Sequence, residues 1–315
     1  MPAFVLRRLG SLVLTLLLLS IIVFGITQLL PGNVAQMILG PYASEDTQAA
    51  LEEKLGLNEP LAEQYVAWLG GFVRGDWGES LRLSREIRPI LLLRLQNSAY
   101  LALSSLIGVA VFGIGLGVIA GVRQNRPADH VISIFAFIGI SLPAFVSGSM
   151  LIILFAGGVW SILPGSGYTP PSEDVREWLT RLVLPTITLM LLLLAYVIRM
   201  TRSSMIEVLS ANYIRTARLK GAPERTVVVR HALRNALLPT VTVIAMNIGW
   251  ILGSVVIVEE IFAYPGVGSL ILFSVNNRDL PLLQATVMAV GAVTGLANLA
   301  ADVAYVYLNP RIRYR

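Results

Sequence analysis

The chain has 315 residues, of which 55% are hydrophobic and only 14% are charged. Soluble domains carry about a quarter charged residues, so this composition excludes an ordinary soluble protein and indicates a lipid environment. The net charge of +5 could indicate a nucleic-acid partner, but the basic residues stand at the ends of apolar runs, which is typical of membrane orientation. There is no cysteine, and the only histidines, His130 and His231, are far apart, so we expect no metal site and no catalytic residues.

The N-terminal region carries two basic residues, Arg7 and Arg8, and continues as an uncharged stretch from Leu9 to Leu30. A cleaved signal peptide is the alternative interpretation, but its apolar core would be only about 7–15 residues long. Crossing a bilayer takes about 20 residues, so we predict a retained first span. The whole chain is predicted to be an all-α polytopic membrane protein with six transmembrane helices, at about residues 9–30, 97–122, 131–157, 182–200, 237–258 and 281–307.

This pattern divides the chain into three parts: residues 1–30, an external segment 31–96, and a five-span core 97–315 that includes a cytoplasmic loop at 201–236. The external segment contains two predicted amphipathic helices. The first has Ser44 as a candidate N-cap and ends near Gly56, and the second starts at Pro60. The apolar face of the second comprises Leu61, Tyr65, Trp68, Leu69 and Phe72. These helices could lie on the outer membrane surface, dock an external partner, or do both.

Within the spans, Pro143 lacks an amide and predicts a kink. Gly113, Gly117 and Gly121 lie four residues apart in an apolar span without a preceding strand. A dinucleotide-binding loop is therefore excluded, and the spacing favours close helix–helix contact instead.

Polar residues at membrane depth are often functional. The candidates for a translocation pathway or a permease–permease contact are Ser141, Pro143, Ser147, Asn247, Asn298 and Asp302. Asn298 precedes Asp302 by one helical turn on the same face. For Asn247, Asn298 and Asp302 the structural alternative is a hydrogen bond to a neighbouring span.

Orientation follows from the positions of the charges. Fifteen basic residues and three acidic ones gather on one side of the predicted spans, against nine basic and fifteen acidic ones on the other. Because basic residues favour the cytoplasmic side, both termini and the loop between Arg199 and Arg234 are predicted to be cytoplasmic.

That loop holds eight basic residues opposed only by Glu207 and Glu224. A first helix is predicted from about Ser210 to Lys220 with Gly221 as its stop, and Pro223 can open a second one. Membrane topology alone would explain the charge. A helix–Gly–helix arrangement long enough to project from the bilayer suggests in addition a lever that transmits motion from a bound partner.

The stretch NYIRTARLKGAPERTVVVRHALRNALLP (212–239) resembles the cytoplasmic loop of binding-protein-dependent ABC importer permeases, in the dipeptide, oligopeptide and nickel branch. The general family pattern is Glu-Ala-Ala, three residues, Gly, nine residues, then Ile-x-Leu-Pro. Anchored on Gly221, this chain matches at Ala217 and Leu233, while Arg234 replaces the proline. Further similar strings are LLPGN (29–33), LGLNEPLAEQYVAWLGGFVRGDWGESL (55–81), SLPAF (141–145), LPGSGY (163–168), EEIFAYPGVGSL (259–270) and NPRIRY (309–314).

The resemblance implies a type I ABC importer permease fold in a bacterial or archaeal plasma or inner membrane. It also implies four kinds of contact: a second homologous permease, two ATPase subunits, an external solute-binding protein and membrane lipid, with no nucleic acid. The sequence contains no G-x-x-x-x-G-K-[ST] phosphate loop, so ATP and Mg are expected in the ATPase partners and no cofactor in this chain.

The region 211–222 would be the coupling helix that rests on an ATPase. Its candidate contact residues are Tyr213, Ile214, Arg215, Ala217, Arg218, Leu219, Lys220, Gly221 and Ala222. For each basic residue, a solvated or lipid-headgroup-facing charge is the alternative.

Peptides are the expected cargo, and nickel, glutathione, opines and oligosaccharides stay open. A secondary transporter is a distant alternative, because it would normally show inverted repeats or several intramembrane carboxylates. A membrane enzyme is also disfavoured, since the spans hold no nucleophile–base pair.

Overall fold

A computed structural model describes residues 2–29, 44, 46, 49, 58–157 and 160–308 of the chain. The elements are α1 (Pro2–Leu29), α4 (Leu61–Arg74), β1 (Glu79–Ser80), β2 (Arg85–Glu86), α5 (Ile87–Gly108), η1 (Val109–Gly113), α6 (Ile114–Val122), α7 (Pro127–Ser141), α8 (Ala144–Ile152), η2 (Ile153–Gly157), α9 (Val175–Leu209), α10 (Asn212–Leu219), α11 (Glu224–Thr226), η3 (Val227–Ala232), α12 (Leu233–Met246), α13 (Ile248–Ile261), α14 (Val267–Asn276) and α15 (Leu280–Leu308). Almost all of the predicted external helix at Ser44–Gly56 and the string at 309–314 lie outside the described residues.

In the described part of the chain, five helical stretches are long and apolar enough to cross a membrane, and six are if α7 and α8 form one broken span. The protein is thus polytopic, and its described residues form helices apart from loops and one short antiparallel strand pair, β1 with β2. The second and fourth spans are longer than predicted, at Ile87–Val122 and Val175–Leu209. Hydropathy marks only the apolar part of a helix, so it misses the polar turns at the ends.

Two predicted spans are interrupted. α7 and α8 meet at an angle of 108° beside Pro143, which accords with the predicted kink. The predicted fifth span, 237–258, is divided between α12 and α13 at Asn247, whose side-chain amide donates to the carbonyl of Val243 at 2.7 Å. η1, η2 and η3 are single wide turns that continue neighbouring helices, and they were not predicted from the sequence.

The described chain divides into two compact units, which are residues 1–96 with 269–296, and 97–268 with 297–315. In the first unit, the aromatic face of α4 packs on α1, where the rings of Tyr65 and Trp68 lie 5.5 and 5.7 Å from that of Phe24. This agrees with the predicted apolar face of α4 at Tyr65 and Trp68, whereas Leu61 of the predicted face is 59% exposed. Asp279, just before α15, accepts a hydrogen bond from the Ser80 hydroxyl at 2.5 Å and so holds the β1–β2 turn.

The second unit has a core built mainly from α9 and α13, with side chains such as Leu189, Leu193, Val255 and Val258 almost fully buried. Its one buried glutamate among the described residues, Glu259 of α13, accepts hydrogen bonds from the Ser98 hydroxyl at 2.5 Å and the Gly268 amide at 2.7 Å. These bonds tie the second half of α5 to the turn after α13.

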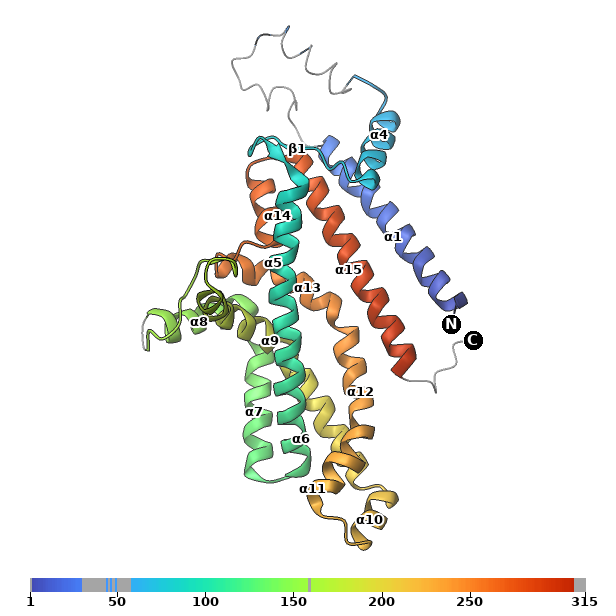
Figure 1. The fold of residues 1–315 in the computed structure, drawn as a ribbon, viewed down its shortest axis with the longest axis vertical. Helices are drawn as coiled ribbons and strands as arrows, with labels where there is room; N and C mark the ends of the chain where they lie inside the picture. Colours follow the sequence, from blue (N-terminus) through green and yellow to red (C-terminus); the bar gives the residue numbers. More distant parts are fainter. Residues whose placement is uncertain are drawn as a thin grey trace. The chain divides into compact units, whose positions relative to one another are not determined.

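Glycines at the end of η1 and in α6 bring this helical stretch against α9 within the unit, and α6 and α9 lie side by side in Figure 1. A Cβ at Gly113 would meet Val197 at 2.7 Å, one at Gly117 would meet Thr201 at 2.5 Å, and one at Gly121 would meet Met205 at 2.6 Å. The predicted role of this four-residue spacing in close helix contact is therefore confirmed.

Candidate functional site: the α10 turn and the α7–α8 break

The α10 helix is attached to α9 by a small core of its own. Ile214 of α10 is fully buried together with Met205 of α9, Val227 of η3 and Ala236 of α12. On the same side the Tyr213 hydroxyl accepts a hydrogen bond from the Asn235 amide at 2.9 Å. Because Ile214 anchors it to the long helix, α10 has little freedom to move without α9.

The end of α10 is fixed by a glycine motif. Gly221 has a φ of +81°, in the left-handed region that favours glycine. Its amide donates to the carbonyl of Arg218 at 3.0 Å, and the amide of Ala222 donates to that of Ala217 at 3.2 Å. This pair of bonds is the Schellman arrangement, so the stop predicted at Gly221 is observed.

The predicted coupling residues fall into two groups. Ile214 is buried, and Ala217 and Ala222 pack against the same small core, so these three support α10 from inside. Leu219 is 81% exposed, and Tyr213 is 45% exposed. Arg215 and Lys220 are also exposed, and Arg218 pairs with Glu224 at 2.7 Å. That ion pair holds the pKa of the Arg218 guanidinium above its ordinary value. The outer face of α10 is therefore basic with one large apolar side chain.

An ion pair between a buried aspartate and a partly exposed arginine joins α7 to α9. Asp129, on the first turn of α7, is 1% exposed. One carboxylate oxygen accepts from Nε of Arg202 at 2.5 Å, and the other accepts from Nη2 at 2.8 Å and from the amide of Asn125 at 2.9 Å. The two-pronged geometry fixes both side chains. Figure 1 shows the α6–α7 turn at the same end of this unit as α10 and α11.

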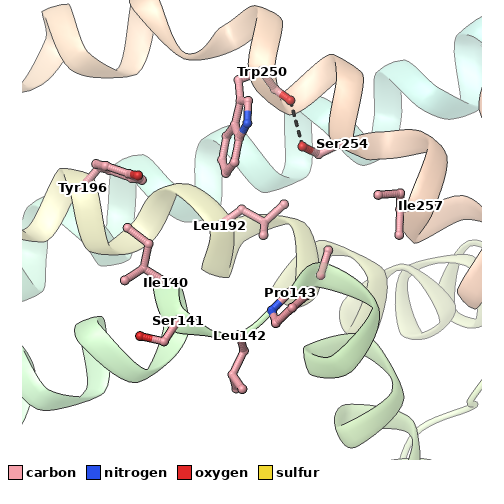
Figure 2. A pocket seen from close by; sticks show the side chains of 10 residues that line it. Ile140, Ser141, Leu142, Pro143, Leu192, Tyr196, Trp250, Ser254 and Ile257 are labelled. Atoms are coloured by element: carbon pink, nitrogen blue, oxygen red, sulfur yellow. Dashed lines mark hydrogen bonds between the residues drawn. The ribbon is translucent and has the colours of Figure 1, made fainter.

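A cavity of about 400 Å³ lies at the break between α7 and α8. Its walls come from three places, shown in Figure 2: the α7–α8 junction, α9 and α13. The lining residues are Ile140, Ser141, Leu142, Pro143, Ala144, Leu192, Tyr196, Trp250, Ser254 and Ile257. Two residues predicted for a pathway, Ser141 and Pro143, are thus part of one cavity.

The other predicted pathway residues lie elsewhere. Ser147 is 4% exposed and donates to the carbonyl of Ala144 at 3.0 Å, so it serves α8 itself. Asn298 packs closely against Gly249 of α13. A Cβ added at Gly249 would lie 2.7 Å from the side-chain oxygen of Asn298. Asp302 lies one turn further along α15 and outside the cavity lining. Asn247 ends α12 and contacts its own helix.

Sequence reasoning missed Tyr196, Trp250 and Ser254 in the cavity and the pair formed by Asp129 and Arg202. An aromatic or serine residue in an apolar run carries no signal of its own. Asp129 did carry one, because it is the only acid within the basic connection that follows Arg123.

Comparison with known proteins gives the family. Residues 113–314 match the binding-protein-dependent transport system inner membrane component family, and residues 1–83 match the N-terminal part of such membrane components. A probable peptide ABC transporter permease protein, y4tP, of Sinorhizobium fredii is 38% identical over the full length of both chains. The glutathione transport system permease protein GsiC is 37% identical in Salmonella choleraesuis and 36% identical in Escherichia coli K12, over 99% of each chain.

A family match over most of the chain agrees with the apolar helices and with the strings quoted above. The family consists of membrane permease components rather than enzymes, and the chain is accordingly a multi-pass inner-membrane protein. The chain belongs to the binding-protein-dependent transport system inner membrane component family and is an ABC importer permease of the peptide and nickel branch.

Proposed function

We propose that this chain forms half of the translocation pathway of an ATP-driven peptide importer and that α10 is its coupling helix. The second half would come from a homologous permease, two ATPase subunits would bind beneath the permease pair with one of them at α10, and an external binding protein would deliver the peptide. ATP and Mg would reside in the ATPase subunits. Both termini and the 201–236 loop would face the cytoplasm, in accord with the basic residues there.

The exposed outer face of α10 is the observation that carries this proposal. A buried Ile214 makes the helix rigid, while Leu219 is 81% exposed beside Arg215 and Lys220. An apolar side chain surrounded by basic ones suits a groove with an apolar floor and an acidic rim on the ATPase. Closure of the ATPase pair would then push α10, and α9 would carry the movement into the membrane.

The test is a complex of this permease with the second permease, the ATPases and the binding protein, reconstituted in proteoliposomes. Leu219→Asp is expected to lose the ATPase subunits on purification and to abolish ATP-dependent peptide uptake, because it places a negative charge in an apolar, basic contact. The free energy of unfolding of the variant permease should change by no more than about 0.5 kcal/mol, as is usual for surface substitutions. Leu219→Met, which keeps an apolar side chain, is the control and should behave as the wild type.

If Leu219→Asp still assembles and transports, α10 is not the coupling helix. Gly221→Pro is a second test of the same site, because proline cannot adopt the observed φ of +81°. This variant should also lose ATP-dependent peptide uptake.

Glutathione is the second candidate cargo, because relatives over 36% identical along 99% of the chain carry that name in their description. Calorimetric titration of the partner binding protein with glutathione and with ordinary tripeptides separates the two candidates. Tight binding of glutathione alone would replace the general peptide assignment.

A further inference from the structure

The α7–α8 break leaves backbone carbonyls without donors. Pro143 has no amide, and among the described residues no amide donates to the carbonyls of Ile140, Ser141 or Leu142. The last carbonyls of any helix lack intrahelical partners, and here the chain turns by 108° directly after them. All three residues line the cavity of about 400 Å³.

In the proposed orientation these carbonyls lie within the hydrocarbon core of the membrane. α7 begins beside the basic residues Arg123 and Arg126, which mark the cytoplasmic surface in the proposed orientation. Its 15 residues extend about 22 Å at 1.5 Å per residue, against a hydrocarbon core of about 30 Å. Lipid tails have no hydrogen-bond donors, so irregular backbone at such depth is tolerated only within protein or beside a polar cavity. An occupant that satisfies these carbonyls must therefore bring donors of its own.

The walls define the rest of the occupant's chemistry. None of the described lining residues is charged. Leu192 and Ile257 supply apolar surface, and Tyr196 and Trp250 supply aromatic rings, with Trp250 46% exposed. The hydroxyl of Ser254 donates to the carbonyl of Trp250 at 2.9 Å, which leaves its oxygen free to accept. The cavity thus combines acceptors with an uncharged, partly aromatic wall.

From this combination we propose that the cavity is a cargo subsite: backbone N–H groups of the transported peptide donate to the carbonyls at the end of α7, and one uncharged side chain of the peptide lies between Tyr196, Trp250 and Ile257. This inference rests on the proposed function, since it needs a peptide in transit. The volume lies at the small end of the range for ligand pockets, about 300–1,000 Å³, and so suits part of a peptide rather than a whole one. This chain would then contribute to selectivity beyond the choice made by the binding protein.

The first experiment identifies the occupant. A photoreactive benzoyl-phenylalanine replaces Ile257, and the full complex is irradiated during ATP turnover with a labelled Ala-Trp-Ala tripeptide loaded on the binding protein. A peptide adduct is expected at Ile257. The same group at Leu103, 57% exposed on α5 and outside the cavity, is the control and should not capture peptide. Adducts at Ile257 with lipid alone or with the second permease alone would overturn the proposal.

The second experiment measures selectivity at saturating binding protein. Ser254→Phe fills the cavity and is expected to lower the ratio of Ala-Trp-Ala to Ala-Gly-Ala uptake by about tenfold, the discrimination typical of a filled apolar pocket. Ser11→Phe, at an exposed serine of α1 with the same kind of backbone hydrogen bond, is the matched control. Trp250→Ala enlarges the cavity and should shift the ratio in the opposite direction, which keeps the test valid if Ser254→Phe does not assemble.

The outcomes separate the two levels of inference. Unchanged ratios in variants that still import both peptides would overturn the subsite and leave the importer assignment intact. A wild-type complex that imports no peptide would overturn the proposed function itself.

Discussion

The two ends of α7 are built in opposite ways. At its beginning Asp129 is locked to Arg202 by a bidentate ion pair, and the neighbouring α6 is pressed on α9 through Gly113, Gly117 and Gly121. At its other end the helix stops, the chain bends by 108°, and a cavity opens beside the break. One helix thus joins a tightly packed region to an open one.

This contrast indicates how motion could pass through the subunit. In the proposed mechanism a push on α10 would move α9, and the ion pair and glycine contacts would make α6 and the start of α7 follow as one body. The change in shape would then fall on the break at Leu142 and Pro143, directly after α7. Changes in the packed region should therefore harm folding, whereas changes at the break should harm it little.

The largest expected effect is that of Arg202→Ala. It leaves the Asp129 carboxylate, 2% exposed, without its partner. Removing one member of a fully buried pair costs about 3–5 kcal/mol, and we expect about 3 kcal/mol because the Arg202 side chain is 30% exposed. Thermal unfolding in detergent measures this. Arg199→Ala, an exposed arginine one turn earlier on α9, is the matched control and should change little.

A melting temperature of Arg202→Ala equal to that of Arg199→Ala would mean that the ion pair does not hold α7 to α9. The variant Asp129→Asn should fall between wild type and Arg202→Ala, because the amide keeps one acceptor but loses the charge.

Gly117→Leu comes next. A side chain there would collide with Thr201 at 2.5 Å and with the backbone oxygen of Ile198 at 2.9 Å, so the two helices would have to separate. Overpacking of this kind costs about 1–3 kcal/mol. Gly115→Leu, on the same helix with nothing within 4 Å, should be tolerated. Equal losses in the two variants, measured by yield of folded protein and melting temperature, would show that the close contact at Gly117 does not decide the result.

Sequence reasoning found the features that local spacing determines. A few neighbouring residues determine each of three features: the glycine repeat from Gly113 to Gly121, the end of α7 before Pro143, and the end of α10 at Gly221. Burial after α11 could be predicted only in part. The sequence has Val228, Ala232 and Ala236 at helical spacing, and the structure places all three at the small core beneath α10. It does not indicate that Val227 is buried while Val229 is 57% exposed.

Contacts between distant residues could not be predicted from one sequence. Asp129 and Arg202 are 73 positions apart, and Ser98 and Glu259 are 161 apart. Nothing in the local pattern specifies such partners. Gly266 leaves the room that the Glu259 carboxylate occupies, and Gly268 lies close to Val256, but a glycine does not indicate in the sequence which residue will approach it.

Gly221→Ala tests the end of the packed region with a smaller effect. No atom lies within 4 Å of the added methyl group, so only the left-handed backbone at φ +81° is penalised, by about 1 kcal/mol. Gly221→Asn is the control, because asparagine tolerates this conformation better, and it should lose less stability. ATPase activity stimulated by loaded binding protein should follow the same order. Identical values for alanine and asparagine would contradict a role for the backbone conformation.

Pro143→Ala at the break should have the smallest effect on stability, about 0.5 kcal/mol. Its φ of −57° and ψ of 147° suit alanine as well, so the substitution mainly adds freedom to the unfolded chain. The bend should survive because α8 is held by its own packing. A Cβ added at Gly148 would lie 3.3 Å from side-chain atoms of Ile261 and Phe262.

Melting temperature measures that stability, and the cross-linking yield at Ile257 reports whether the cavity persists. A loss as large as that of Gly117→Leu would mean that the proline ring itself sets the bend. The open end of α7 would then be as constrained as its locked end, and the break could not be the place where the subunit yields when α10 is pushed.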